Sequence, residues 1–213
     1  MDAAAAHLAT WPDGALVLAP SIGGVARHRA PTRWLKQTRT YADGTDYRSH
    51  NEDATRRDRV LRALSAFEGA KPEDYEVAHR ELLGGRALYR DRLIAFSRQG
   101  RRVHGVVPRL AERFRARQVL IGSASDPFVR AALRYLDVVF LHPFVDGNAR
   151  AARIVLEAEL NRSGIALLVP FSSLVSFPKR AGDRSNNLAF ARLVRRVCEV
   201  SAPHRRAEGV YVR

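Results

Sequence analysis

The chain has 213 residues, of which 46% are hydrophobic and 27% are charged; this balance predicts one globular domain with a real hydrophobic core and excludes a disordered chain. Its single cysteine, Cys198, excludes an internal disulfide, and no apolar run approaches the length of a transmembrane helix. The first segment, MDAAAAHLATWPDG, makes a poor signal peptide, so these features together favour a cytoplasmic location without a membrane partner.

The basic residues give a formal net charge of +14, and all but three of the 36 are arginines. A surface of this sign attracts polyanions, so nucleotides, nucleic acid and an acidic protein are all compatible partners. A coding bias towards arginine would give the same composition. Charge alone therefore does not choose among these classes.

The first half of the chain predicts an arm followed by helices. Residues 1–50 are broken repeatedly by proline and glycine, which favours an irregular arm. A helix is expected from about 51 to 67, a second from Pro72 to Gly84, and a third over about 86–98. The polar RQGRRVHG that follows is typical of a solvated turn, and His104 within it is expected at the surface without a role.

In the second half, Val119-Leu120-Ile121 followed by Gly122 predicts a short strand. Apolar helical patterns then run from Pro127 towards 142 and from Asn148 to Ser163-Gly164, and a last one covers 187–200. The apolar segment 165–171 between them predicts an extended link. We therefore expect a mostly helical domain over 51–203 and a frayed tail over 204–213.

The chemistry is concentrated in DVVFLHPFVDGNARAAR, residues 137–153, where two predicted helices meet. The second helix begins with N–H groups that lack partners and attract an anion. Arg150 and Arg153 are three residues apart and can hold phosphates from one helix face. Asp146 can bind Mg²⁺ between phosphates, and His142 can accept a proton near neutral pH. These residue types predict a phosphate site with a base beside it.

The segment from His142 to Arg153, HPFVDGNARAAR, closely resembles the motif of the Fic family, H-P-F-x-[D/E]-G-N-G-R-x-x-R. Every fixed position matches except Ala149, where the family usually has glycine. The resemblance implies a mainly α, Fic-like helical bundle with a short β flap over the active site. It also implies one role for each motif residue: His142 is the catalytic base, Phe144 anchors the loop, Asp146 binds the metal, Gly147, Asn148 and Ala149 line the anion site, and Arg150 and Arg153 hold the nucleotide phosphates, with Arg150 also catalytic.

The reaction that this resemblance implies is transfer of AMP from Mg-ATP to a hydroxyl of a target, a protein Ser, Thr or Tyr by expectation. ATP and Mg²⁺ are then the co-substrate and cofactor, and the chain is a nucleotidyltransferase of the protein adenylyltransferase kind. Relatives of the Doc type carry lysine where this chain has Ala149 and transfer phosphate. Transfer of phosphate or another phosphate-linked group, with a small-molecule hydroxyl as one acceptor, is therefore a second hypothesis, and an inactive Fic-fold binding module is a third.

The segment from Phe114 to Gly122, FRARQVLIG, resembles the Fic flap, in which an aromatic residue and an arginine precede Q-V-x-I-G. The resemblance implies that Gln118, Val119, Leu120, Ile121 and Gly122 position the target by strand pairing. Only four residues separate Gly122 from Pro127, where most relatives have another helix. This spacing predicts a shortened domain with a more open cleft.

Many Fic proteins are inhibited by a helix with the pattern [S/T]-x-x-x-E-[G/N]. The two Glu-Gly pairs of this chain, at Glu68 and Glu208, do not fit it, because the fourth residue before each is Leu64 and His204. Ser65 lies one position from the required place, which keeps Glu68 as a weak candidate. Otherwise we expect an uninhibited enzyme or one that is restrained by a separate antitoxin-like partner.

Overall fold

The computed structural model describes His7 and residues 54–67, 71–84, 89–90, 95–96, 103–165, 167 and 172–207. These residues are mainly helical, as the sequence predicts. The elements in chain order are α4 (Ala54–Ala66), α5 (Asp74–Leu83), β1 (Ala95–Phe96), β2 (Val103–His104), α6 (Leu110–Gly122), α7 (Pro127–Leu141), α8 (Asn148–Arg162), α9 (Ser172–Ser176) and α10 (Arg184–Ala207). The expected arm over 1–50, apart from His7, and residues 208–213 of the expected tail lie outside the described residues.

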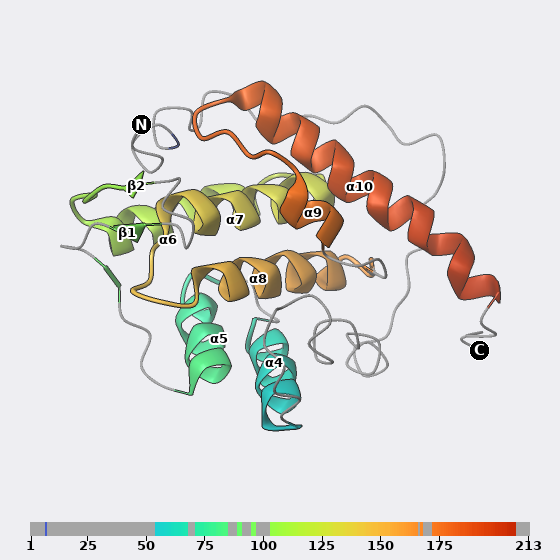
Figure 1. The fold of residues 1–213 in the computed structure, drawn as a ribbon, viewed down its shortest axis with the longest axis horizontal. Helices are drawn as coiled ribbons and strands as arrows, with labels where there is room; N and C mark the ends of the chain where they lie inside the picture. Colours follow the sequence, from blue (N-terminus) through green and yellow to red (C-terminus); the bar gives the residue numbers. More distant parts are fainter. Residues whose placement is uncertain are drawn as a thin grey trace.

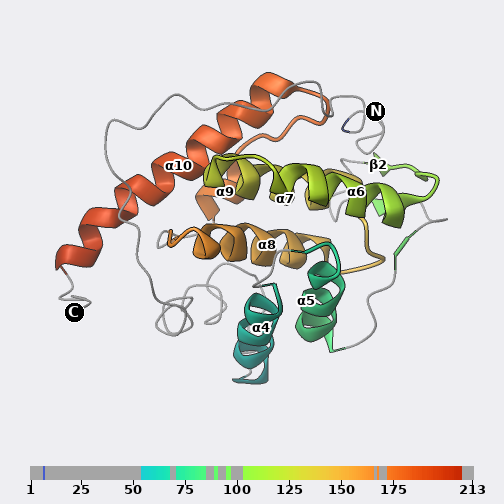
Figure 2. The ribbon, with the colours of Figure 1, turned by 180° about the vertical axis from the view of Figure 1, so that it is seen from behind.

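Helices α7 and α8 lie side by side at the centre of the molecule (Figure 1). Most of α7 is buried, and every residue of α8 from Ala151 to Leu160 is buried. Helices that are buried on all sides need neighbours on all sides. Here α10 covers α7, while α4 and α5 pack against α8, as the opposite views in Figures 1 and 2 both show. The loop between α7 and α8 is therefore anchored at both ends in the core.

Local signals set the ends of these helices. Asp126 caps α7, since its carboxylate accepts hydrogen bonds from the backbone N–H of Phe128 (2.8 Å) and Val129 (3.1 Å), and Pro127 occupies the first turn. Helix α5 ends at Gly84, whose φ of 72° is left-handed, and Gly164 follows α8 with a φ of 69°. The boundaries at Pro127, Gly84 and Gly164 were predicted from the sequence, whereas the cap by Asp126 was not.

Within the helix predicted over 86–98, the structure describes only residues 89–90 and 95–96, and at these residues the prediction is wrong. Tyr89 instead forms an isolated antiparallel bridge with Phe144, and Ala95–Phe96 pairs with Val103–His104 in a two-stranded antiparallel sheet. An apolar run this short fits a helix or a strand equally well by its spacing. Pairing with residues distant in the sequence decided the outcome.

The strand predicted at 119–121 is also wrong, because these residues lie in α6. The buried residues Leu110, Phe114 and Ile121 recur at helical spacing, and this period outweighs the strand preference of three consecutive large apolar residues. Helix α6 thus stands between the β1–β2 hairpin and α7. The expected shortening of the domain stays a prediction. Helix α9 was not predicted, and α10 extends through Ala207.

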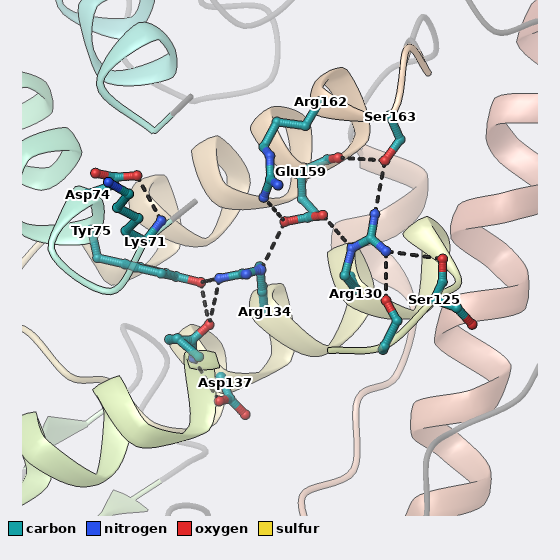
Figure 3. Close-up of polar contacts among 12 residues, drawn as sticks. Lys71, Asp74, Tyr75, Ser125, Arg130, Arg134, Asp137, Glu159, Arg162 and Ser163 are labelled. Carbon is teal, nitrogen blue, oxygen red and sulfur yellow. Dashed lines mark hydrogen bonds and ion pairs between the residues drawn. The ribbon is translucent and has the colours of Figure 1, made fainter. Parts of the chain in front are cut away.

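A buried ionic network ties α7 to α8 at a distance from the loop between them. Glu159 of α8 is fully buried and pairs with Arg130 at 2.7 Å and with Arg134 at 2.9 Å, both from α7. Figure 3 shows Arg134 lying between this carboxylate and Tyr75, whose hydroxyl accepts a hydrogen bond from Arg134 Nη1 at 3.0 Å. The network fixes the central pair of helices and connects it to α5.

Candidate functional site

His142 is the first residue after α7, and its backbone is left-handed, with a φ of 49°. Residues other than glycine adopt this backbone conformation at a cost of about 1–2 kcal/mol. The conformation turns the chain sharply out of the helix, while His142 N still donates to Val138 O at 3.1 Å. The strained residue is thus the candidate base itself, as is common at functional sites.

The last backbone carbonyls of α7 are all satisfied, three of them by side chains of residues outside the helix. Since a helix end leaves four carbonyls without an internal partner, these bonds fix how α7 ends. The donors, in chain order of the acceptors, are His142 N to Val138 O (3.1 Å), His142 Nδ1 to Val139 O (3.1 Å), His104 Nδ1 to Phe140 O (2.7 Å) and Arg90 Nη2 to Leu141 O (2.5 Å). Arg90 Nε also donates to His142 O at 2.5 Å.

These bonds define the tautomer of His142. A carbonyl oxygen only accepts, so the Nδ1 that contacts Val139 O carries the hydrogen. In the neutral ring the lone pair is therefore on Nε2, which is the nitrogen able to take a proton. The ring is half-buried and stacks on His104, with ring centroids 4.0 Å apart and planes 19° apart.

Phe144 anchors the loop in the core, as the family resemblance implies. Its side chain is fully buried and stacks on His79, with centroids 4.0 Å apart. Asn148 closes the loop through two bonds to the backbone of Phe144: its Oδ1 accepts from Phe144 N at 3.0 Å and its Nδ2 donates to Phe144 O at 2.7 Å. Asn148 is therefore buried beneath the loop, and its side chain holds the loop's shape.

Gly147 is required by both its backbone and its surroundings. Its φ of 74° is left-handed, and a Cβ placed there would lie 2.8 Å from Leu83 Cδ1 and 3.3 Å from His79 Nε2. A real Cβ does not approach another atom so closely. Helix α5 thus presses directly against the start of α8, and only glycine fits between them.

His79 of α5 holds the same loop through a hydrogen bond to its backbone. Its Nε2 donates to the backbone oxygen of Asp146 at 2.7 Å, and its buried Nδ1 has no hydrogen-bond partner. Burial lowers the pKa of His79; the bond to Asp146 O opposes this effect, and the charge of Arg150 adds to it. The ring therefore acts as a neutral donor to the loop.

The N-terminal turn of α8 faces outward. No side chain caps the helix, and the first internal bond runs from Ala151 N to Gly147 O at 2.9 Å. Ala149 is exposed and lies within the helix, so it does not need the conformational freedom of the usual glycine. This turn can bind an anion through its N–H groups.

Asp146 and Arg150 lie beside this turn. The Asp146 side chain is 80% exposed; its Oδ1 accepts from Gly147 N at 2.6 Å and its Oδ2 lies 3.4 Å from Arg150 Nη2. Arg153, by contrast, is 1% exposed and donates to Glu157 at 3.1 Å. The structure therefore brings Arg150 to the outer face of the site but not Arg153, whose guanidinium lies within the core.

The residues predicted as a flap, 118–122, lie in the last turns of α6 and not in a strand. Gln118 is buried, where its Nε2 donates to Asp137 at 2.9 Å and its Oε1 accepts from the Tyr75 hydroxyl. Val119 and Leu120 are exposed on α6, Ile121 is buried and Gly122 ends the helix. Strand pairing by these five residues is therefore wrong.

Asp137 binds α6 to α7 through the same buried cluster. Arg117 donates to its carboxylate at 2.6 and 3.0 Å, and His7 Nε2 lies 2.7 Å from it. Burial by itself would raise the pKa of this carboxyl, but the charge of Arg117 and the hydrogen bonds outweigh it and lower the pKa to about 2. The cluster is a structural link between the helices.

The sequence contained little indication of His79, Arg90 and His104. His104 was expected at the surface and is fully buried, which is a correction. Strand β2 has only two residues, too few for an alternating pattern to show which of them points inward. Arg90 makes its bonds across some 50 positions, and no local pattern marks it.

A model of the Fic/DOC family matches residues 70–160, which include α5 and nearly all of α8. Two curated relatives are both named protein adenylyltransferase fic-1. The one from Caenorhabditis briggsae is 49% identical over 41 residues, and the one from Caenorhabditis elegans is 49% identical over 39 residues. These matches cover 19% and 18% of this chain and 8% of each relative, so the chain spans less than a tenth of their length.

Among solved structures, a Fic domain-containing signalling protein from Bacteroides thetaiotaomicron has a TM-score of 0.52 at 16% identity, covering 84% of this chain and 82% of that one. A fragment of Fic-1 from C. elegans has a TM-score of 0.47 at 22% identity, covering 79% and 56%. The first of these shows a shared fold. Residues 70–160 of the chain thus match the model of the Fic/DOC family, and the chain shares the fold of a Fic domain-containing protein.

Proposed function

We propose that the chain is a Fic-type transferase that moves AMP from Mg-ATP to a hydroxyl group of a target protein, with His142 as the general base. The observation that carries this proposal is the geometry of the loop between α7 and α8. It combines a histidine whose lone pair is on Nε2 with an uncapped helix N-terminus a few residues away. Such a pair can take a proton from an acceptor and hold a phosphate next to it.

In the proposed reaction, Nε2 of His142 takes the proton of the acceptor hydroxyl. The hydroxyl oxygen forms a bond to the α-phosphorus of ATP, and the bond from that phosphorus to the pyrophosphate oxygen breaks. The N–H groups at the start of α8 and the guanidinium of Arg150 stabilise the negative charge on the phosphate oxygens. Pyrophosphate leaves, and the target carries AMP.

Asp146 is the residue that would hold Mg²⁺. Its carboxylate is largely exposed beside the helix N-terminus, and no cluster of three or more possible metal ligands occurs among the residues that the structure describes. Magnesium commonly binds through one or two carboxylates together with substrate phosphates, so this single exposed carboxylate fits. When bound, the ion would neutralise phosphate charge.

Arg153 has a different role from the one implied by the motif alone. Because its guanidinium is buried and bonded to Glu157, Arg150 is the arginine available at the site as it stands. We infer that Arg153 contacts phosphate only if its bond to Glu157 is exchanged. Arg150 should then account for most of the affinity for nucleotide.

The two worm relatives are adenylyltransferases by name, which favours AMP over phosphate as the transferred group. Alanine at position 149 is compatible with this choice, since its helical backbone does not demand glycine and it lacks the charge of lysine. For positioning the target, we propose the β1–β2 hairpin, because His104 at its second strand contacts His142 directly. Backbone pairing at such an edge is a common mode of peptide recognition.

The test supplies the purified chain with Mg²⁺ and ATP labelled at the α or the γ phosphate, with a cell lysate as acceptor. Label kept from the α position alone, and lost in the His142→Asn variant, supports AMP transfer. Label from the γ position alone would replace the proposal with phosphate transfer. Nucleotide binding without any label that depends on His142 would favour a binding module.

Arg150 has a matched control on another helix. Arg150→Ala and Arg192→Ala remove the same charge, and Arg192 is exposed on α10. Loss of ATP binding in the first variant but not in the second would tie the effect to the site. Equal losses would mean that the overall positive charge, rather than the helix N-terminus, attracts the nucleotide.

A further inference from the structure

His104 is a buried histidine that the proposed reaction does not itself require. It lies on β2, its side chain is fully buried, and its ring is stacked on that of His142 at 4.0 Å with 19° between the planes. A ring in this position covers one face of the candidate base. It therefore limits how that base can turn.

The two histidines are anchored to neighbouring carbonyls of α7. His142 Nδ1 donates to Val139 O and His104 Nδ1 donates to Phe140 O, at 3.1 and 2.7 Å. Because both acceptors are carbonyl oxygens, both rings carry their hydrogen on Nδ1. Rotation of the His142 ring would break its own bond and clash with the stacked ring. The arrangement thus selects the tautomer with the lone pair on Nε2.

Arg90 holds the strand that carries His104 against the end of α7. Its guanidinium donates to the backbone oxygens on both sides of the stack: to Leu141 and His142 at 2.5 Å each, and to His104 and Gly105 at 3.2 and 2.9 Å. Its backbone N–H also donates to Pro143 O at 3.0 Å. The distance between the two rings is therefore set by backbone bonds as well as by ring contact.

From this stack of His104 on His142, bridged by Arg90, we propose that His104 is a positioning residue that fixes the ring orientation and the Nδ1–H tautomer of the base. This inference rests on the proposed function of His142, but its structural part can be tested without activity. His104 does not touch substrate in this role. It acts only through His142.

Three substitutions separate the two contacts of His104. His104→Phe keeps a ring of similar size and loses the donor to Phe140 O. His104→Asn keeps a donor and loses the ring, and His104→Leu loses both. Val175→Leu on α9 is the control, since the Val175 side chain is exposed and lies outside both the hairpin and the loop between α7 and α8.

The first readout is the side-chain ¹⁵N NMR spectrum of His142 at about pH 8, well above the ordinary pKa of histidine. We expect one tautomer, protonated on Nδ1, in the wild type and in Val175→Leu, and a mixture of tautomers in His104→Leu. An unchanged single tautomer in a folded His104→Leu protein overturns the proposal. The asparagine variant, which has no ring to stack on His142, decides the question if the leucine variant does not fold: mixed tautomers there support the role and a single one contradicts it.

The second readout is turnover. General bases contribute about 10²–10⁴-fold, so loss of positioning should lower kcat by roughly 10-fold or more while KM for ATP changes little. His104→Phe, which keeps a ring to stack on His142, should recover part of kcat, and a KM effect alone would contradict the proposal. If the wild type transfers no group, the proposed function fails, and the NMR result still shows whether His104 orients His142.

Discussion

The two ends of the α7–α8 pair use carboxylates in opposite ways. Glu159 is fully buried and held by Arg130 and Arg134, while Asp146 is 80% exposed and only 3.4 Å from Arg150. A buried carboxylate held by two arginines cannot accept a ligand without leaving them. An exposed one with a loose partner can. The difference indicates that one end of the helix pair fixes the fold and that the other is available for chemistry.

The same contrast appears in the backbone. Helix α7 begins with a side-chain cap from Asp126, whereas it ends in a left-handed histidine and α8 begins without a cap. Strain and unsatisfied groups are thus collected at the His142 end. Substitutions at the Glu159 end should therefore change mainly the stability of the chain, and substitutions at the His142 end should change mainly group transfer.

The largest effect is expected for His142→Asn on group transfer. Asparagine tolerates left-handed backbone better than most residues, so the loop should keep its shape while the base is lost. Transfer should fall by about 10²–10⁴-fold. The free energy of unfolding, measured in urea, should change by about 1 kcal/mol or less. A large loss of stability would mean that His142 holds the fold together as well.

The opposite end should respond in the reverse way. Glu159→Gln leaves the buried Arg134 and the half-buried Arg130 without their carboxylate and should destabilise the chain by about 3–5 kcal/mol, measured as the shift in urea unfolding. Its control is Glu112→Gln, which removes an exposed pair with Arg109 and should cost less than about 1 kcal/mol. Equal costs in the two variants would contradict the idea that burial gives Glu159 its importance.

Asp146→Asn completes the comparison between the ends. Because Asp146 is exposed and weakly paired, we expect a change in stability below about 1 kcal/mol. If it binds Mg²⁺ together with phosphates, the Mg²⁺ concentration needed for half-maximal transfer should rise. A variant that loses stability and keeps its Mg²⁺ dependence would assign Asp146 to the fold instead.

Gly147→Ala should lower the stability of the chain less than Glu159→Gln does and more than Asp146→Asn does. Left-handed backbone at an alanine costs about 1–2 kcal/mol, and the new Cβ would also press on Leu83. Leu83→Ala removes that second cost, so alanine at 147 should be less harmful in the Leu83→Ala background by about 1 kcal/mol. Thermal or urea unfolding of the four proteins measures this coupling. Strict additivity would mean that the backbone conformation alone explains the glycine.

How much of this could be predicted from sequence depends on how local each signal is. The start of α7 at Pro127 and the end of α5 at Gly84 were predicted because their causes lie within a few residues. The motif from His142 to Asn148 was likewise predicted as a loop opening a helix. Its burial beneath α5, however, depends on Leu83 and His79, which no local pattern connects to it.

Most of the mistakes share one physical origin, which is packing against residues that are distant in the sequence. His104 was placed at the surface because its neighbours in the sequence are polar, yet its ring is stacked on a residue 38 positions away. Arg153 looked like a surface arginine, and its burial follows from packing of α8 in the core. Only in α6 was the deciding signal local, since Leu110, Phe114 and Ile121 already show helical spacing.

The smallest effect concerns pH and His79. Burial lowers the pKa of this ring in the folded chain, whereas the unfolded chain has the ordinary value of about 6.5. As pH falls below about 6.5, the unfolded chain takes up a proton that the folded chain resists, so the folded state loses stability. His79→Phe keeps the stack on Phe144 and abolishes this titration.

At about pH 7.5, His79→Phe should cost about 1 kcal/mol, because the hydrogen bond to Asp146 O is lost. The difference between variant and wild type should shrink as pH falls towards about 5, since only the wild type is then destabilised by the unmet protonation of His79. Urea unfolding at both pH values measures it. A difference that grows at low pH would mean that the charged ring binds Asp146 O more strongly than burial opposes it. The loop beside the candidate base would then be held more firmly in acid than at neutral pH.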